Sequence, residues 1–147
     1  MISYSEAKNI EETVRYFYVL ENEQWHKSVH QKGGSVEENV KYTVGVVSPE
    51  SVMYEVIYGP ELAGFFVKYE NESGKAMEGF HIKKEFRKGW FIKEFWGIVK
   101  KEFGSTFYVG LCSINTSGID HVIRQGFKKV KDVVENDKLF VVLECKQ

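Results

Sequence analysis

The sequence predicts a mixed α/β fold of the α+β sandwich type, with helices packed on a mostly antiparallel central sheet of about six to seven strands. Three observations support this fold class. Apolar residues recur at helical spacing near the N-terminus and again over residues 90–103. Short runs rich in β-branched and aromatic residues fill most of the remaining chain. The order strand, helix, strand over residues 76–113 predicts a crossover helix between two parallel strands.

The N-terminal part of the chain is predicted to be helical. Ser3 and Glu6 have the spacing of a capping box, and apolar residues follow at helical spacing, so we predict a first helix over roughly residues 5–20. A helical pattern also extends through residues 22–32, before two glycines end it. His26 and His30 lie four residues apart on this extension. A solvated helix face explains them better than a metal site, because no third ligand has a matching position.

Residues 35–82 are predicted to change from helix to strand. Ser35 and Glu38 form a second capping box, which favours a helix, although the β-branched residues that follow are also compatible with a strand. After this segment, strand-like runs alternate with turn residues, as expected for an antiparallel meander. The predicted strands cover residues 52–59, 62–70 and 76–82.

The C-terminal half is predicted to begin with the crossover helix. Its buried stripe is formed by Ile92, Trp96, Val99 and Phe103, and Gly104 is the expected stop. A buried strand follows over residues 106–113, and then a short helix within residues 115–127. The chain is predicted to end with strands near residues 127–134 and 138–144.

Length and composition limit the function classes. With 147 residues and no linker, the chain is expected to form one domain over residues 1–147. Its 20 basic and 21 acidic residues give a net charge of -1, which argues against nucleic acid and against an acidic membrane surface as partners. The sequence has neither a signal peptide pattern nor a long apolar run, so a cytoplasmic protein is expected. Cys112 and Cys145 lie in apolar runs and are predicted to be reduced, buried thiols.

The stretch NTSGIDHVIRQGF, residues 115–127, carries the most specific motif. Asn115 follows a predicted buried strand, and Gly126-Phe127 comes after ten intervening residues. This spacing, together with the order of elements over nearly the whole chain, resembles the GNAT acetyltransferase superfamily. The resemblance implies that the two parallel strands splay apart near Ile82 and Cys112 and that acetyl-CoA enters between them. It also implies that Asn115 lies near the pantetheine arm and that Gly126-Phe127 turns the chain into the next strand.

Residues 81–91, HIKKEFRKGWF, resemble the strand end and the pyrophosphate loop of that superfamily. A turn that enters a helix directs free backbone N–H groups and the positive end of the helix dipole at an anion. The lysines and the arginine of this stretch add full positive charges. The resemblance therefore assigns cofactor binding to Ile82, Arg87, Lys88, Gly89, Trp90 and Asn115.

This loop departs from the superfamily pattern, and we describe it as degenerate. Arg87 precedes Gly89 by only two residues, so the loop is one residue short. Phe91 stands where a small residue usually lets phosphate approach the backbone, and its side chain is expected to block the cradle. Val122 stands where the superfamily often has a general-acid tyrosine, which excludes acid catalysis by that route.

The predicted chemistry is acyl transfer to a primary amine, which needs a base for the amine and a hydrogen bond for the thioester carbonyl. Glu78, in the fourth predicted strand, is the candidate base, and a backbone N–H near residues 80–82 is the implied carbonyl partner. By strand alternation Glu78 is expected to share a face with Ala76, Phe80 and Ile82, so that partial desolvation raises its pKa. The alternative is a surface carboxylate paired with a lysine.

Other polar residues are weaker candidates. His81, on the opposite face of the same strand, is interpreted as a packed histidine in preference to an alternative base. Ser113 either donates to the leaving thiolate or caps the following helix. The lysines of 83–84, 100–101 and 128–131 are predicted to gather at the cofactor end, with ordinary solvated charge as the alternative.

The aromatic residues of the crossover helix raise the question of assembly. Residues 90–96 contain more aromatic side chains than one buried stripe needs. We expect most of them in the core; an exposed remainder would form a patch for a homodimer.

Two functions from different classes fit the sequence. The first is an N-acetyltransferase that uses acetyl-CoA and acts on a small-molecule or protein amine. The second is a catalytically inactive protein of the same fold that serves in binding or assembly, for example a phage head-assembly protein. The shortened loop, Phe91 and Val122 favour the second, whereas Asn115 with Gly126-Phe127 and the basic helix entry favour the first.

Overall fold

The computed structural model of the chain describes residues 1–21, 35–135 and 137–147, and the structural statements below concern these residues. The predicted helical extension over residues 22–32, with His26 and His30, lies outside the described residues.

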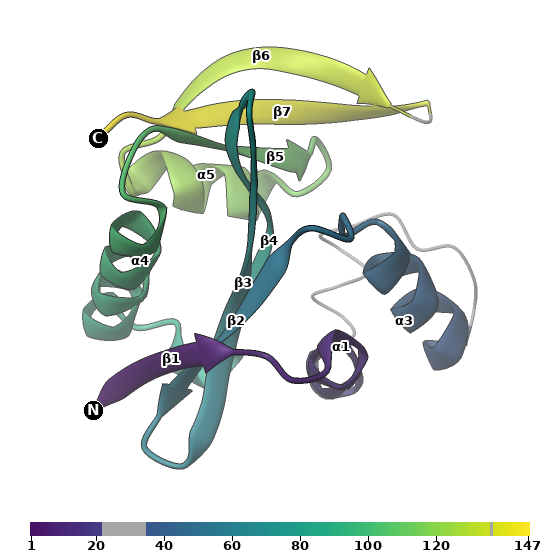
Figure 1. Cartoon of the computed structure of the whole chain (residues 1–147), viewed down its shortest axis with the longest axis vertical. Helices are drawn as coiled ribbons and strands as arrows, with labels where there is room; N and C mark the ends of the chain where they lie inside the picture. The colour runs from purple at the N-terminus through teal and green to yellow at the C-terminus, as the bar shows by residue number, and fades with distance from the viewer. Residues whose placement is uncertain (22–34, 136) are drawn as a thin grey trace.

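One seven-stranded sheet forms the centre of the molecule (Figure 1). Its strands lie in the order β1-β2-β3-β4-β5-β7-β6. Neighbouring strands are antiparallel except for β4 and β5, which are parallel. The predicted mixed, mostly antiparallel sheet is therefore confirmed. The strands are β1 Ile2–Glu6, β2 Val52–Tyr58, β3 Glu61–Asn71, β4 Gly74–Ile82, β5 Phe107–Cys112, β6 Lys128–Glu135 and β7 Lys138–Cys145.

The N-terminus differs from the prediction. Residues 2–6 form an edge strand, with Ser3 opposite Ile57 in β2, so the capping box predicted at Ser3 and Glu6 is wrong. The first helix, α1, spans Ile10–Leu20 and is capped by Asn9, whose side chain accepts a hydrogen bond from Glu12 N–H at 3.1 Å. The capping-box spacing is a local signal, and here the long-range pairing with β2 outweighs it.

The remaining helices follow the local sequence signals. Helix α3, Val36–Gly45, is capped as predicted by Ser35, whose hydroxyl oxygen accepts from Glu38 N–H. Helix α4, Gly89–Phe103, ends at Gly104, which has a left-handed φ of 73° that glycine adopts without strain. Helix α5 spans Thr116–Arg124, and a short 3₁₀ turn, η1, spans Lys84–Phe86.

The helices cover the two faces of the sheet and enclose one core on each face. Adjacent residues of β3 show the alternation: Phe65 packs in the core with α1 and α3, and Phe66 packs in the core with α4. Phe91, Phe95 and Trp96 of α4 are at most 1% exposed, whereas Trp90 is 51% exposed. The aromatic residues of α4 therefore lie mostly in the core, as expected.

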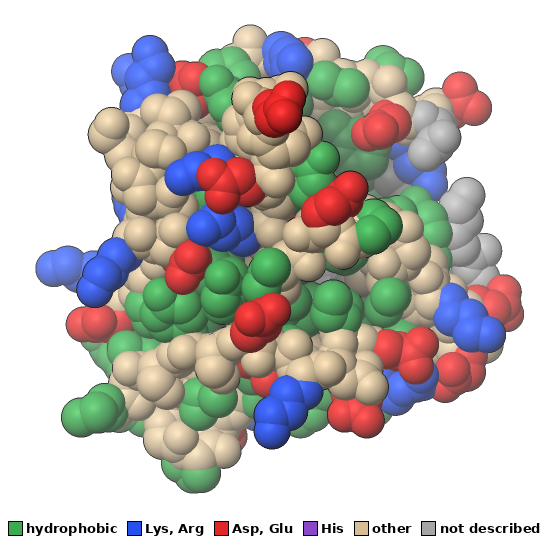
Figure 2. All heavy atoms as spheres, viewed as in Figure 1, with side chains coloured by type: hydrophobic (Ala, Val, Ile, Leu, Met, Phe, Trp, Pro, Cys, Tyr) green, Lys and Arg blue, Asp and Glu red, His purple; other side chains and the backbone are tan. Residues whose placement is uncertain are grey.

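The surface shows no concentration of charge on the face seen in Figure 2, where basic and acidic side chains lie interspersed. The predicted gathering of lysines is wrong for Lys100 and Lys101. They lie in the last turn of α4, about 17 Å along the helix from its N-terminus. Cys112 and Cys145 are buried free thiols, as predicted. Within the described ranges, no helix is both long enough and apolar enough to cross a membrane.

Candidate functional site

Strands β4 and β5 part soon after they meet. Their register joins Ala76 to Tyr108 and Met77 to Val109, and it ends there, although β4 continues to Ile82 and β5 to Cys112. On its other edge β4 stays paired with β3 as far as Ile82. Figure 1 shows β5 running with β7 and β6 at a steep angle to β2, β3 and β4. The predicted splay near Ile82 and Cys112 is confirmed. Among the described residues, no strand pairs with this edge of β4 along residues 78–82.

A β-bulge in β4 lies at the point where the strands part. Val67 of β3 lies opposite Gly79 and Lys68 lies opposite Met77, so Glu78 is an extra residue without a partner in β3. A bulge bends its strand and adds twist. The bulge follows directly after the last residue that β4 shares with β5, which accounts for the divergence of the two strands.

The bulge also changes which side chains share a face. Phe80 contacts Phe95 and Trp96 on the α4 side of the sheet. Glu78 is exposed, and its carboxylate accepts hydrogen bonds from Ser48 N–H at 3.0 Å, from Ser48 Oγ at 2.7 Å and from the Ser51 hydroxyl. The prediction that Glu78 is partly desolvated beside Phe80 and Ile82 is therefore wrong, because strand alternation does not hold across a bulge.

The turn after β4 leads into the N-terminus of α4. Lys88 is the N-cap residue, and in the part of the chain that the structure describes no side chain caps the first turn of the helix. Phe91 is fully buried and packs against Phe86, with the ring centroids 5.0 Å apart. The expectation that Phe91 blocks this space is wrong, since the ring points into the core. A side chain built at Gly89 would meet no atom within 4 Å, so the backbone there is accessible.

A buried carboxylate holds this turn. Glu21, 10% exposed, accepts a hydrogen bond from Lys84 N–H at 2.8 Å and lies 2.6 Å from His81 Nε2 and 3.4 Å from Arg87 Nη2. Arg87 also donates from Nε to the carbonyl oxygen of Ile82 at 2.8 Å. The structure thus places Arg87 beside the open end of β4, where its guanidinium is held by contacts that include Glu21 and the Ile82 carbonyl oxygen.

Burial and hydrogen bonding determine the charge states of Glu21 and His81. Burial acts to raise the pKa of Glu21, but hydrogen bonds from His81 and from Lys84 N–H outweigh it and leave that pKa below its ordinary value. Burial lowers the pKa of His81 more than the carboxylate raises it. A neutral imidazole that donates Nε2–H to an ionised Glu21 satisfies both trends. His81 is the packed strand histidine that was expected.

Asn115 lies at the carboxyl end of β5 and caps α5. Its backbone N–H donates to Cys112 O at 2.9 Å, and its side-chain Oδ1 accepts from Gly118 N–H at 3.0 Å. Asn115, and not Ser113, is thus the helix cap. Gly126, with φ of 98°, turns the chain, and Phe127 is buried in the core, as the resemblance implied.

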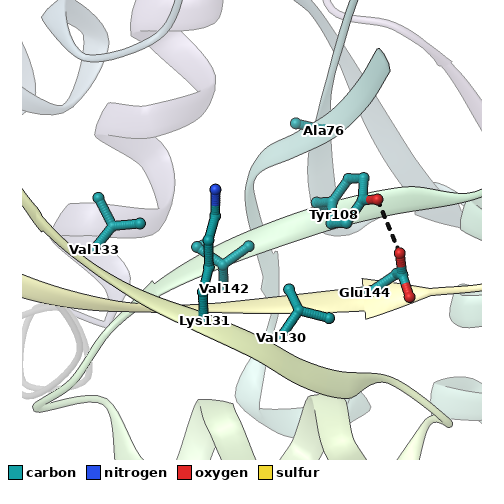
Figure 3. Close-up of a pocket in the computed structure, with 8 residues that line it drawn as sticks. Ala76, Tyr108, Val130, Lys131, Val133, Val142 and Glu144 are labelled. Atoms are coloured by element: carbon teal, nitrogen blue, oxygen red, sulfur yellow. Dashed lines mark hydrogen bonds between the residues drawn. The ribbon is translucent and has the colours of Figure 1, made fainter. Parts of the chain in front are cut away.

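A hollow of about 590 Å³ lies beside the last parallel pair, on the face of β5 away from α5 (Figure 3). Phe107 and Val109 point into the core, so Tyr108 and Gly110 face this hollow. The Tyr108 hydroxyl donates to Glu144 at 2.8 Å. The hollow has no signature in the sequence, because its wall joins strands that are distant in the chain. Its lining residues are Ala76, Tyr108, Gly110, Val130, Lys131, Val133, Val142 and Glu144.

Solved structures share this arrangement of elements. An acetyltransferase from Salmonella typhimurium that modifies the N-terminal serine of the ribosomal protein L7/L12 superposes with a TM-score of 0.72 at 15% identity, over 99% of this chain and 95% of that one. A probable GNAT-family acetyltransferase from Chromobacterium violaceum gives 0.73 at 11% identity, over 99% and 82%. This is the GNAT fold. An aminoglycoside 6'-N-acetyltransferase complexed with coenzyme A gives 0.64 at 15% identity, over 99% and 96%.

The likeness to the GNAT fold is structural. No protein-family model and no curated protein matches the chain. The described residues contain no group of three or more side chains that could hold a metal ion.

Proposed function

We propose that the chain is an N-acetyltransferase that moves the acetyl group of acetyl-CoA directly to a primary amine. The observation that carries this proposal is the parting of β4 and β5 at Met77, with an uncapped helix N-terminus close to the open end of β4. Strands held together by hydrogen bonds leave no room between them, whereas these two leave one backbone edge available.

The residues around the opening fit acetyl-CoA. The free edge of β4 along residues 78–82 offers backbone donors and acceptors to a pantetheine arm, which carries amide groups of its own. The N–H groups at Gly89 and Trp90, the helix dipole and the exposed Lys88 suit a pyrophosphate. The side-chain oxygen of Asn115 caps α5, which leaves its amide N–H groups to donate to the pantetheine arm from the β5 side.

The hollow beside Ala76 and Tyr108 suits the acceptor amine. It adjoins the parting point from the face away from α5, so an amine there would approach a thioester held between the strands. Its lining combines valines with Lys131 and the Tyr108–Glu144 pair, and the carboxylate of Glu144 is the lining group that suits the charged head of an amine. Glu78, at the bulge, is the proposed base that removes a proton from the amine.

Calorimetry with acetyl-CoA and with CoA tests the proposal. We expect micromolar binding to the wild type and binding about three- to tenfold weaker for Lys88→Gln, which loses one charge at the α4 N-terminus. Lys101→Gln is the matched control, because it removes the same charge from the other end of the same helix. It should bind CoA like the wild type. Equal weakening in both variants would contradict a site at the N-terminus of α4.

The alternative, an inactive assembly protein, is not favoured by the structural neighbours, which are acetyltransferases. It makes an opposite prediction: no binding of CoA at millimolar concentration, and self-association that increases with protein concentration in sizing experiments. Release of free CoA thiol in the presence of a panel of amines, including peptides with a free N-terminus and aminoglycosides, would decide for the enzyme and identify the acceptor class.

A further inference from the structure

Three aromatic rings that contact one another lie on the α4 and α5 side of the opening between β4 and β5. Phe80 belongs to the part of β4 that has left β5, and His121 of α5 stacks on it, with ring centroids 6.2 Å apart and ring planes 24° apart. Trp96 of α4 contacts both rings, at 5.2 Å and 5.8 Å. His121 thus reaches from the helix that follows β5 to the free part of β4.

A hydrogen bond determines which nitrogen of His121 carries the proton. The indole Nε1–H of Trp96 donates to His121 Nε2 at 2.8 Å. Tryptophan can only donate, so Nε2 must be unprotonated and the neutral ring carries its proton on Nδ1. Burial, followed by the positive charges of Arg124 and Arg87, lowers the pKa of His121 and keeps the ring neutral. Among the described residues no group accepts a hydrogen bond from Nδ1.

We propose that His121 Nδ1–H donates a hydrogen bond to the sulfur of bound acetyl-CoA as that sulfur leaves, a role that rests on the proposed acetyl transfer. The unprotonated amine attacks the thioester carbonyl carbon, the N–C bond forms, and the C–S bond breaks with its electron pair on sulfur. The nitrogen loses its extra proton to Glu78 or to water. His121 keeps its own proton, and the thiolate takes one from solvent afterwards.

His121 is better suited to donate this hydrogen bond than Val122 or Tyr108. Val122 is fully buried in the core and carries no polar atom. Tyr108 faces the hollow on the other side of the sheet and is bound to Glu144. A neutral imidazole held in one tautomer is a preorganised donor, and such donors stabilise charge that develops in the transition state.

Nitrogen NMR of the histidine rings tests the tautomer in the wild type without any substitution. We expect His121 to be protonated on Nδ1, and His81, which donates to Glu21 from Nε2, to show the opposite tautomer as an internal control. Saturation with CoA should shift the Nδ1 signal of His121 and leave His81 nearly unchanged. An unchanged His121 signal at saturation, or a proton on its Nε2, would overturn the proposal.

Two substitutions separate the hydrogen bond from packing. His121→Phe keeps a ring on Phe80 and removes the donor; His121→Asn keeps a donor close to the Nδ1 position. For His121→Phe we expect kcat to fall about 10- to 100-fold, with little change in the Kd of acetyl-CoA. The thiol pKa of bound CoA, followed by thiolate absorbance, should rise by about one unit or more, and His121→Asn should recover part of both effects.

The outcomes distinguish this inference from the proposed function. Turnover and CoA binding that persist in His121→Phe, with an unchanged thiol pKa, would refute the role of His121 and leave the acetyltransferase proposal standing. Failure of the wild type to bind CoA would refute both. If His121→Phe does not fold, the wild-type NMR experiment and His121→Asn still decide.

Discussion

The carboxylate of Glu21, directly after α1, lies 2.6 Å from the Nε2 of His81, near the end of β4 and sixty residues further along the chain. The same carboxylate accepts the backbone N–H of Lys84. Glu21 therefore ties the first helix to the turn that leads into α4. The shape of this turn, and with it the direction of the α4 N-terminus, depends on a residue far away in the sequence.

Replacing Glu21 should loosen this turn. In Glu21→Gln the new amide NH2 group is a donor that would face the donor Nε2–H of His81, and the negative charge beside Arg87 is lost. We therefore expect the free energy of unfolding in urea to fall by about 1–3 kcal/mol. Glu85→Gln is the control, because that carboxylate is mostly exposed on the same turn. It should change stability by less than about 0.5 kcal/mol. Equal stability of the two variants would show that the Glu21 contacts do not hold the turn.

Stability should also depend on pH through His81. Its pKa is lower in the folded chain than its ordinary value of 6.5, so the unfolded chain binds a proton that the folded chain does not. As far as His81 is concerned, the free energy of unfolding is therefore highest above about pH 6.5 and falls as the pH drops below that value. Because the pKa of His121 is lowered too, His81→Gln should flatten only part of this slope in thermal unfolding between pH 7 and 5. A slope unchanged in His81→Gln would rule His81 out as a source.

The cap of α5 provides a second stability test. A Cβ at Gly118 would lie 2.7 Å from Cγ of Asn115, so Gly118→Ala must displace the side chain that caps the helix. Asn115→Ala removes the same cap and should cost about 1 kcal/mol. Because both changes act on one hydrogen bond, Gly118→Ala should cost much less in the Asn115→Ala background than alone. Additive losses of unfolding free energy in this cycle would contradict the shared mechanism.

Elements that depend on neighbouring residues could be predicted from the sequence. Helix α4 and its end at Gly104, the cap at Ser35, and the turn at Gly126 before buried Phe127 all follow from local spacing and from the freedom of glycine. The GNAT-like order of elements follows from these signals taken together.

Features that depend on distant residues could not be predicted in this way. Strand β1 exists because β2, about fifty residues later, pairs with it. The bulge at Glu78 is determined by the register with β3, and this one extra residue moves Phe80 to the face opposite to the one predicted from Glu78. The contact of Glu21 with His81 has no local signature at all. Each of these features depends on residues that only the folded sheet brings together.

The junction of β3 and β4 near the open end is sensitive to side-chain size. A Cβ at Gly64 would lie 2.5 Å from the carbonyl oxygen of His81, a backbone atom that cannot rotate away. Gly64→Ala should therefore push β3 from β4 opposite Ile82 and cost about 1–3 kcal/mol of unfolding free energy. Gly79→Ala, in the same pair of strands, meets no atom within 4 Å and is the control. A Gly64→Ala variant as stable as Gly79→Ala would disprove the close approach.

The proposed role of Glu78 as the base can be separated from its contacts with the neighbouring loop. Its carboxylate is exposed at the bulge and accepts hydrogen bonds from Ser48 and Ser51, so Glu78→Gln keeps an acceptor for the loop but removes the base. We expect kcat to fall about 10²-fold or more, with unchanged CoA binding and unchanged stability. Ser51→Ala is the comparison variant: it removes one donor to the carboxylate and leaves the base in place, so turnover should persist. Full turnover by Glu78→Gln would remove Glu78 as the base and leave proton removal to water at the same bulge.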